Sequence, residues 1–109
     1  TGVLYAALDW PGLSVGAKRR AASRVITISA LWGALRPADA VPPYRLSMNV
    51  RMPGIGALNT WWRAHLTPVL DAASADAGVI LDCRSETYAK VWTPEGSPTP
   101  AMWTCSHAR

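Results

Sequence analysis

The fold is decided by the stretch Val25-Ile26-Thr27-Ile28-Ser29, which is short, rich in β-branched residues and uninterrupted by turn residues. A run of this kind is typical of a central strand buried on both faces. The stretch Val79-Ile80-Leu81-Asp82-Cys83 has the same character. Helical patterns lie between and around these two runs, and strands that alternate with helices indicate parallel pairing. We therefore predict a mixed α/β fold with short, largely parallel buried strands, as a partial domain of a larger fold.

The strongest helical pattern lies between the two strands. Apolar residues recur there at spacings of three and four, which indicates one buried face, at Leu58, Trp61, Trp62, His65, Leu66, Val69 and Leu70. Pro68 interrupts the pattern, and Thr67 can cap a new turn that begins with this proline. We expect a kink or a restart of the helix at this point.

Three shorter helices are also predicted. Val3–Leu8 is helical in composition and is stopped by the turn residues Pro11 and Gly12. Ser14 can cap a helix over Val15–Ser23, because its hydroxyl can accept a bond from a free amide of the first turn. In the same way, Ser85 can cap a helix over Glu86–Trp92.

The last part of the chain shows no periodic pattern. Four residues that disfavour regular structure occur within Thr93–Arg109, namely Pro94, Gly96, Pro98 and Pro100. We predict that residues 1–92 are the central part of a single domain and that residues 93–109 form an irregular or disordered tail. Since the first residue is not Met and the chain begins within a helical pattern, we expect a fragment of a longer protein.

Composition allows an anionic partner without requiring one. The 109 residues carry a formal net charge of +4, and nine of the eleven basic residues are Arg. No run is long and apolar enough to cross a bilayer, and no secretory signal is visible. Cys83 and Cys105 are too few and too far apart for a disulfide framework or a zinc site, so a reducing cytosol is the expected setting. We predict no catalytic residue, no metal and no cofactor, and we expect no membrane partner.

Basic residues concentrate in the helix predicted over Val15–Ser23 and directly after it. Lys18, Arg19, Arg20 and Arg24 fan around the helix instead of lining one face. They can attract phosphate groups, or they can belong to a solvated surface helix whose Ala17 and Ala21 face inward.

The loop from Ser29 to Met48 contains charged residues together with proline and glycine. In open α/β sheets, ligands bind beyond the carboxyl ends of the strands. If the two predicted strands are neighbours, one rim gathers Arg36, Arg45, Asp82, Arg84 and Ser85. Arginine suits such a site because its planar fork of donors matches phosphate or carboxylate oxygens. Alternatively, Arg36 or Arg45 pairs with Asp39 or Asp82 and only holds the loop in place.

Residues Pro53–Gly56 resemble the hairpin of a helix-hairpin-helix element, in which glycine amides and a helix N-terminus grip a DNA phosphate. The alternative is a simple glycine loop that enters a helix. His65, Trp61 and Trp62 are expected in the core because of their helical spacing, although a tryptophan can also stack on a nucleobase. Cys83 is expected to be a small buried hydrophobe.

Four blocks of the sequence resemble one known family. The central block is Ser29-Ala30-Leu31-Trp32-Gly33 followed by Leu35-Arg36-Pro37, Asp39, Tyr44-Arg45-Leu46 and Met48. It is similar to the YaaA-like peroxide stress proteins, and three further blocks agree with this resemblance. These blocks are Thr1–Tyr5 with Leu8-Asp9, Leu58 with Trp61-Trp62, and Asp82 with Ser85 and Tyr88. The resemblance covers residues 1–91. Trp32, Ser47 and Asp82 stand where Tyr, an acid and Asn are common in the family.

The resemblance implies a bacterial cytosolic protein of mixed α/β fold. It also implies a role in surviving hydrogen peroxide by lowering free intracellular iron, and binding of double-stranded DNA through a basic cleft and a helix-hairpin-helix-like element. The residues expected to contact phosphate are Lys18, Arg19, Arg20, Arg36, Arg45 and Arg84. The motif residues expected to support them are Ser29, Gly33, Pro37, Asp39, Tyr44, Met48, Asp82, Ser85 and Tyr88.

Two alternatives accompany this hypothesis. The first is an enzyme or binding protein that holds a nucleotide or phosphate on the rim of Arg36, Asp39, Arg45, Asp82 and Ser85. The second is an inert fragment whose exposed sheet edges promote aggregation. Residues 93–109 do not resemble the family's continuation, which leads us to expect a truncated or frameshifted product.

Overall fold

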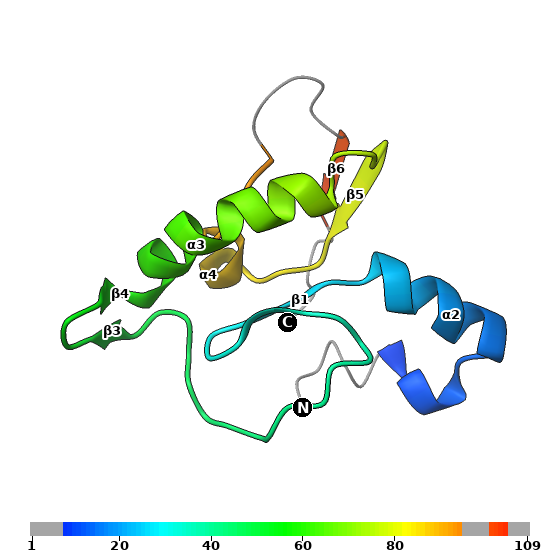
Figure 1. Cartoon of the computed structure of the whole chain (residues 1–109), viewed down its shortest axis with the longest axis horizontal. Coiled ribbons are helices and arrows are strands. Elements are labelled where there is room, and N and C mark those ends of the chain that lie inside the picture. The colour runs from blue at the N-terminus through cyan, green and yellow to red at the C-terminus, as the bar shows by residue number, and fades with distance from the viewer. Residues whose placement is uncertain (1–7, 95–100, 105–109) are drawn as a thin grey trace. The chain divides into compact units, whose positions relative to one another are not determined.

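A computed structural model describes residues 8–94 and 101–104 of the chain. These residues form two compact units, divided between Pro43 and Tyr44 (Figure 1). The helix predicted at Val3–Leu8 lies outside the described residues except for Leu8. Both units contain helices and short strands, so the predicted mixed α/β class is confirmed.

From Asp9 onward, the first unit consists of a short helix, one longer helix and one strand pair. A short 3₁₀ helix, η1 (Trp10–Gly12), precedes α2 (Val15–Arg24). Ser14 caps α2 as predicted, because its hydroxyl accepts a bond of 3.1 Å from the amide of Ala17. After α2 the chain forms β1 (Thr27–Ser29), turns, and returns as β2 (Gly33–Leu35).

The pairing of β1 differs from the prediction. It pairs antiparallel with β2, and Ser29 lies opposite Gly33 across the turn. Gly33 has φ of 82°, a left-handed conformation that glycine adopts without steric cost. The prediction of a parallel strand buried on both faces is therefore wrong for β1, because the glycine turn folds the chain back onto its own strand.

The second unit begins with a small hairpin and a long helix. β3 (Arg51–Met52) pairs antiparallel with β4 (Gly56–Ala57), which leads directly into α3 (Leu58–Ala73). Pro68 lies inside α3, which continues through it. The predicted restart is wrong, because Thr67 donates its hydroxyl to the carbonyl of Arg63, 2.6 Å away, instead of capping a new helix.

The remaining elements are β5 (Val79–Asp82), α4 (Glu86–Ala89) and β6 (Ala101–Thr104). β5 and β6 pair in parallel, so the predicted parallel arrangement is found here but between a different pair of strands. The prediction of an irregular tail is wrong at Ala101–Thr104, which forms β6. α4 is shorter than the predicted Glu86–Trp92 and ends at Ala89.

The apolar core of the described residues lies mainly in the second unit. Leu58, Leu66 and Leu70 face it from α3, each no more than 6% exposed. Met48, Val91 and Trp92 are also buried in this unit, whereas the first unit contributes Ala30. Three leucines at spacings of four and eight form the buried stripe that the sequence predicts for this helix.

Candidate functional site: a basic helix and two anchored arginines

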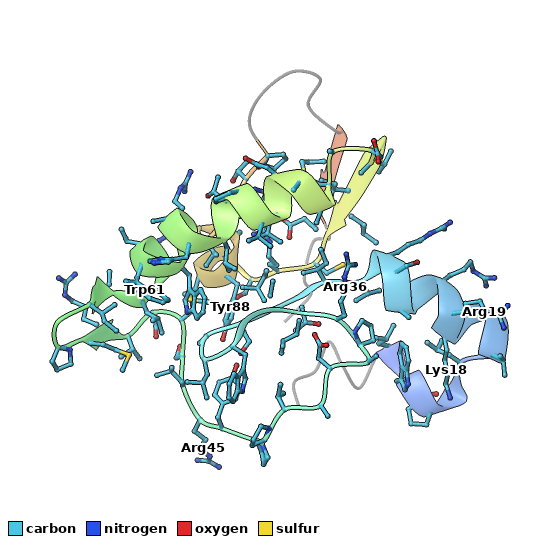
Figure 2. All side chains as sticks on the ribbon, viewed as in Figure 1. Lys18, Arg19, Arg36, Arg45, Trp61 and Tyr88 are labelled. Carbon is cyan, nitrogen blue, oxygen red and sulfur yellow. The ribbon has the colours of Figure 1, made fainter. Side chains whose placement is uncertain are left out.

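The exposed basic surface of the first unit lies on α2. All ten residues of this helix are described, and none of them is buried. Arg19, Arg20 and Arg24 are exposed and Lys18 is half-buried, while α2 contains no acidic residue. Figure 2 shows the side chains of Lys18 and Arg19 extending from this helix. Within residues 8–94 and 101–104, none of these four side chains forms an ion pair.

Ala17 and Ala21 are half-buried, as expected for the inward side of a surface helix. This geometry is compatible with both sequence-based alternatives for α2, a phosphate-binding surface and a plain solvated face. Because the guanidinium groups of Arg19, Arg20 and Arg24 are exposed and without acidic partners in the part of the chain that the structure describes, they are available to an anion.

Arg36 and Asp39 lie together at the end of β2. The carboxylate of Asp39 accepts a bond of 2.7 Å from the backbone amide of Arg36, and the carbonyl of Arg36 accepts one of 3.0 Å from the amide of Asp39. The Arg36 guanidinium donates through Nη1 to the carbonyl of Ser23, at 2.9 Å, near the end of α2. Asp39 therefore shapes the loop, and Arg36 anchors that loop to the basic helix.

Ser29 has a structural role in the same unit. Its side chain is 3% exposed, and its hydroxyl oxygen accepts bonds from the amides of Leu31 and Trp32, at 3.3 and 3.0 Å. These bonds hold the turn that joins β1 to β2. Pro37 is half-buried at the end of this strand pair.

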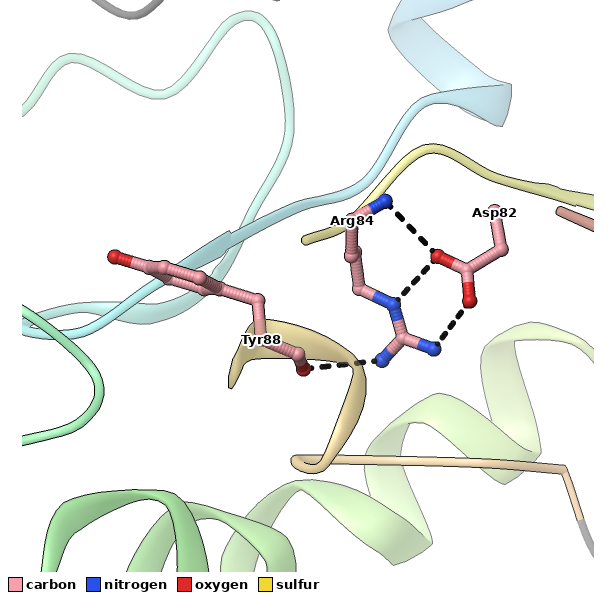
Figure 3. Close-up of polar contacts among 3 residues, drawn as sticks. All are labelled: Asp82, Arg84 and Tyr88. Atoms are coloured by element: carbon pink, nitrogen blue, oxygen red, sulfur yellow. Dashed lines mark hydrogen bonds and ion pairs between the residues drawn. The ribbon is translucent and has the colours of Figure 1, made fainter. Parts of the chain in front are cut away.

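Arg84 is bound to Asp82 at the end of β5 (Figure 3). Its Nε and Nη2 donate to the two carboxylate oxygens, both at 2.8 Å, and its backbone amide donates to Oδ1 at 3.1 Å. Nη1 donates to the carbonyl of Tyr88 at 3.4 Å, and the guanidinium lies 5.9 Å from the ring centre of Trp92. The two side chains of this ion pair are only 16% and 9% exposed.

This arrangement engages every nitrogen of the Arg84 guanidinium with groups of the protein itself. A phosphate oxygen would have to compete with a bidentate carboxylate, the geometry in which arginine pairs most strongly. The structure therefore gives Arg84 a role in joining β5 to α4. Ser85 occupies the N-cap position of α4, but it makes no side-chain capping bond within the described residues.

Arg45 lies at the start of the second unit, together with the motif residues Tyr44 and Met48. Arg45 is exposed and projects away from the loop that carries it (Figure 2). Tyr44 is 38% exposed, whereas Met48 is fully buried. The predicted rim combines residues of both units. Within the first unit Arg36 lies beside Asp39, and within the second unit Asp82 pairs with Arg84.

The glycine hairpin predicted at Pro53–Gly56 forms the turn between β3 and β4. Gly54 and Gly56 have φ of 77° and 87°, and the amide of Leu58 donates to the carbonyl of Val50 at 3.0 Å. Residues 44–50 just before it form neither helix nor strand, so the described residues hold a hairpin and a following helix without the first helix of a helix-hairpin-helix element. This supports the simpler of the two predictions, a glycine loop that enters a helix.

Two positions of α3 are more exposed than the sequence predicts. His65 is exposed, so its prediction as a packed core residue is wrong. Its ring stacks on that of Trp61, with ring centres 4.0 Å apart. Its Nδ1 lies 2.7 Å from the carbonyl of Trp61. Val69 is 53% exposed, since the buried stripe narrows to Leu58, Leu66 and Leu70. Trp61, Trp62 and Cys83 are each half-buried.

Sequence reasoning missed one contact that holds the second unit together. Nε1 of Trp92 donates to the carboxylate of Asp71 at 2.8 Å, and Trp92 is 6% exposed. Trp92 thus links the end of α3 to the segment after α4 and also faces Arg84. The two residues are 21 positions apart in different elements, so no local periodicity indicates this contact.

Comparison with known proteins identifies the family. The family model described as peroxide stress protein YaaA matches residues 1–107. The chain belongs to the YaaA family of peroxide stress proteins. The match includes most of residues 93–109, so the prediction that this tail departs from the family is wrong.

Curated relatives of the YaaA family agree with this assignment. A UPF0246 protein of Streptomyces coelicolor is 52% identical over 96 residues, which are 88% of this chain and 36% of the relative. UPF0246 proteins of Ralstonia nicotianae and Leptothrix cholodnii are 36% and 35% identical, over 86% and 83% of this chain and 38% and 37% of their own lengths. The chain thus spans little more than a third of the relatives it matches.

Two kinds of feature are absent from the part of the chain that the structure describes. No helix among residues 8–94 and 101–104 is long and apolar enough to span a membrane. In the same residues, no group of three or more His, Cys, Asp or Glu side chains is placed to hold a metal ion.

Proposed function

We propose that this chain binds double-stranded DNA as part of a bacterial peroxide stress protein, with α2 supplying the main contacts to phosphate. One observation carries the proposal: α2 exposes three arginines and contains no acidic residue. Arginine and lysine contacts to phosphate supply most of the affinity in DNA binding that does not depend on sequence. Such contacts need accessible cationic groups, and α2 provides them.

The other predicted residues support this proposal to different degrees. Arg45 is exposed and can add a phosphate contact beyond the first unit. Arg36 donates to the Ser23 carbonyl, so it positions the loop beside α2 and keeps part of its guanidinium for a ligand. Arg84 is engaged with Asp82 and is left out of the proposed interface.

A salt titration tests DNA binding. The affinity of the chain for a short duplex is measured at several salt concentrations, from about 50 to 200 mM, where phosphate contacts lose strength by counterion release. We expect log affinity to fall linearly with log salt concentration. A flat response, or no binding at low salt, would contradict the proposal.

Two single variants locate the contacts. Arg20→Gln should reduce the salt slope by about 1, because one phosphate contact is lost. Arg63→Gln removes the same charge from α3, where Arg63 donates to the carbonyl of Lys90, and should leave the slope unchanged. Equal effects of the two variants would mean that only net charge matters.

The same binding measurements separate DNA from the small-anion alternative. Inorganic phosphate and nucleotides are added to the chain, and its thermal stability is recorded. A ligand that binds the folded state raises the melting temperature. Stabilisation by a nucleotide that Arg36→Ala abolishes, without binding to duplex DNA, would favour a small-anion site over the proposed interface.

The proposal extends to the physiology of the family. We propose a cytosolic protein that limits the damage caused by peroxide and free intracellular iron, and membership of a peroxide stress family supports the peroxide part. Expression in a bacterium that lacks its own family member should raise survival of hydrogen peroxide and lower free iron measured by electron paramagnetic resonance. Unchanged survival and unchanged free iron would contradict this role.

A further inference from the structure

One face of β5 carries an exposed apolar surface. Val79 and Leu81 are 59% and 65% exposed, whereas Ile80 is half-buried and Asp82 is buried. Alternate residues of a strand face opposite sides, so Val79 and Leu81 lie on the same outer face. The sequence predicts this strand to be buried on both faces, and within the described residues only one of them is covered.

The pairing of β5 makes this exposure unusual. β5 and β6 form a parallel pair that, within the described residues, is a sheet of two strands. Parallel sheets occur almost only where both faces are covered, and their strands are therefore apolar throughout. The apolar sequence of β5 fits a covered strand, which indicates that a further layer belongs on its outer face.

The lengths of the relatives indicate where this layer comes from. The Streptomyces coelicolor protein matches this chain over only 36% of its own length, so most of its chain lies outside the matched segment. A second copy of this chain is a poorer occupant. Stable interfaces between separate chains bury about 800 Å² per partner, and two aliphatic side chains offer only a small part of that area.

We propose that the Val79 and Leu81 face of β5 packs against an apolar layer contributed by the part of the longer family chain that lies outside the matched segment. This proposal concerns assembly of the fold and is independent of DNA binding. It makes β5 a strand with both faces covered in the full-length family fold.

Cysteine accessibility tests the proposal. Val79→Cys is made in this chain, and the aligned residue of the Streptomyces coelicolor protein is also replaced by cysteine. Alkylation rates are read by peptide mass spectrometry, which distinguishes the new thiol from Cys83 and Cys105. We expect rapid alkylation in this chain, and in the relative a rate at least about tenfold slower than in the same protein under denaturing conditions.

Val69→Cys is the matched control, because Val69 is 53% exposed on α3 and undergoes the same substitution. In this chain, Val79→Cys should react within about twofold of the Val69→Cys rate, since both sites are open to solvent. If the first position does not tolerate cysteine in the relative, the residue aligned with Leu81 serves as the second probe.

Two results would overturn the proposal. The first is slowing by less than about tenfold in the relative, which would show that no layer protects this face there. The second is protection of Val79→Cys that increases with the concentration of this chain, which would assign the face to a second copy.

Discussion

The helices α2 and α3 have opposite relations to the core. α3 buries Leu58, Leu66 and Leu70, while α2, described in full, buries none of its residues. Both have a polar face, but only α3 has an apolar stripe that is wide enough to pack. Sequence periodicity therefore distinguishes a helix that builds the fold from one that is displayed on its surface.

Charge separates the same two regions. Residues 1–43 contain five basic and two acidic residues, while residues 44–109 contain six basic and five acidic ones. In the second unit, Arg84 and Asp82 neutralise each other near the core. In the first unit the excess of positive charge is concentrated on α2, which is why we place the anion contacts there.

Truncating a core leucine of α3 should have the largest effect on stability. Leu66→Ala removes buried apolar groups and leaves a cavity, so the free energy of unfolding should fall by about 3–4 kcal/mol. The control Val15→Ala on α2, where Val15 is 75% exposed, should change it by less than about 0.5 kcal/mol. Denaturant unfolding measures both. Similar losses of stability in the two variants would contradict the conclusion that α3 builds the core and α2 lies on the surface.

Breaking the ion pair should have the next largest effect. Arg84→Met leaves the nearly buried Asp82 carboxylate without the guanidinium that neutralises it, and stability should fall by about 2–3 kcal/mol, below the value for a fully buried pair. The double variant Arg84→Met/Asp82→Leu should recover much of this loss, since it leaves no unpaired charge. Urea denaturation of the three proteins tests this, and equal stability of single variant and parent would refute it.

Removing the cap of α2 should have a smaller effect. Ser14→Ala deletes the bond to the Ala17 amide and should lower the free energy of unfolding of the first unit by about 1 kcal/mol. Ser85→Ala is the matched control, because Ser85 makes no side-chain capping bond to α4 in the described residues. Amide hydrogen exchange in the first turn of each helix reports the two effects separately. A larger increase in the amide exchange rate in α4 than in α2 would contradict the assigned caps.

Local signals predict much of this fold. The Ser14 cap, the α3 stripe and the turn at Gly54 all follow from short-range chemistry, and the structure contains each of them. The return of β1 onto β2 was missed because the strand within Ser29–Met48 is only three residues long and begins with a glycine. The parallel partner of β5 was missed because β6 lies within a stretch rich in proline.

The candidate site was harder to predict. Sequence identifies arginines but does not show whether each has a partner, and Arg84 and Arg20 differ in just this respect. The contacts of Arg84 with Asp82 are local, yet its approach to Trp92 depends on the path of the chain after α4. Burial and pairing, which need the folded chain, separate structural arginines from accessible ones.

The most direct test of the account is a pair of charge variants of equal size. Arg19→Gln/Arg20→Gln/Arg24→Gln neutralises α2, and Arg51→Gln/Arg63→Gln/Lys90→Gln neutralises three exposed positions of the second unit. Each set removes three positive charges. The measurement is the slope of log affinity for duplex DNA against log salt concentration, with unfolding curves to confirm that both variants fold.

We expect the α2 variant to lower the magnitude of this slope by about 2–3 and the second-unit variant to lower it by less than about 1. The α2 variant should unfold within about 0.5 kcal/mol of the parent, because its altered side chains lie on the surface. Equal slopes for the two variants, or a greater loss in the second-unit variant, would contradict the claim that α2 is the DNA-binding surface.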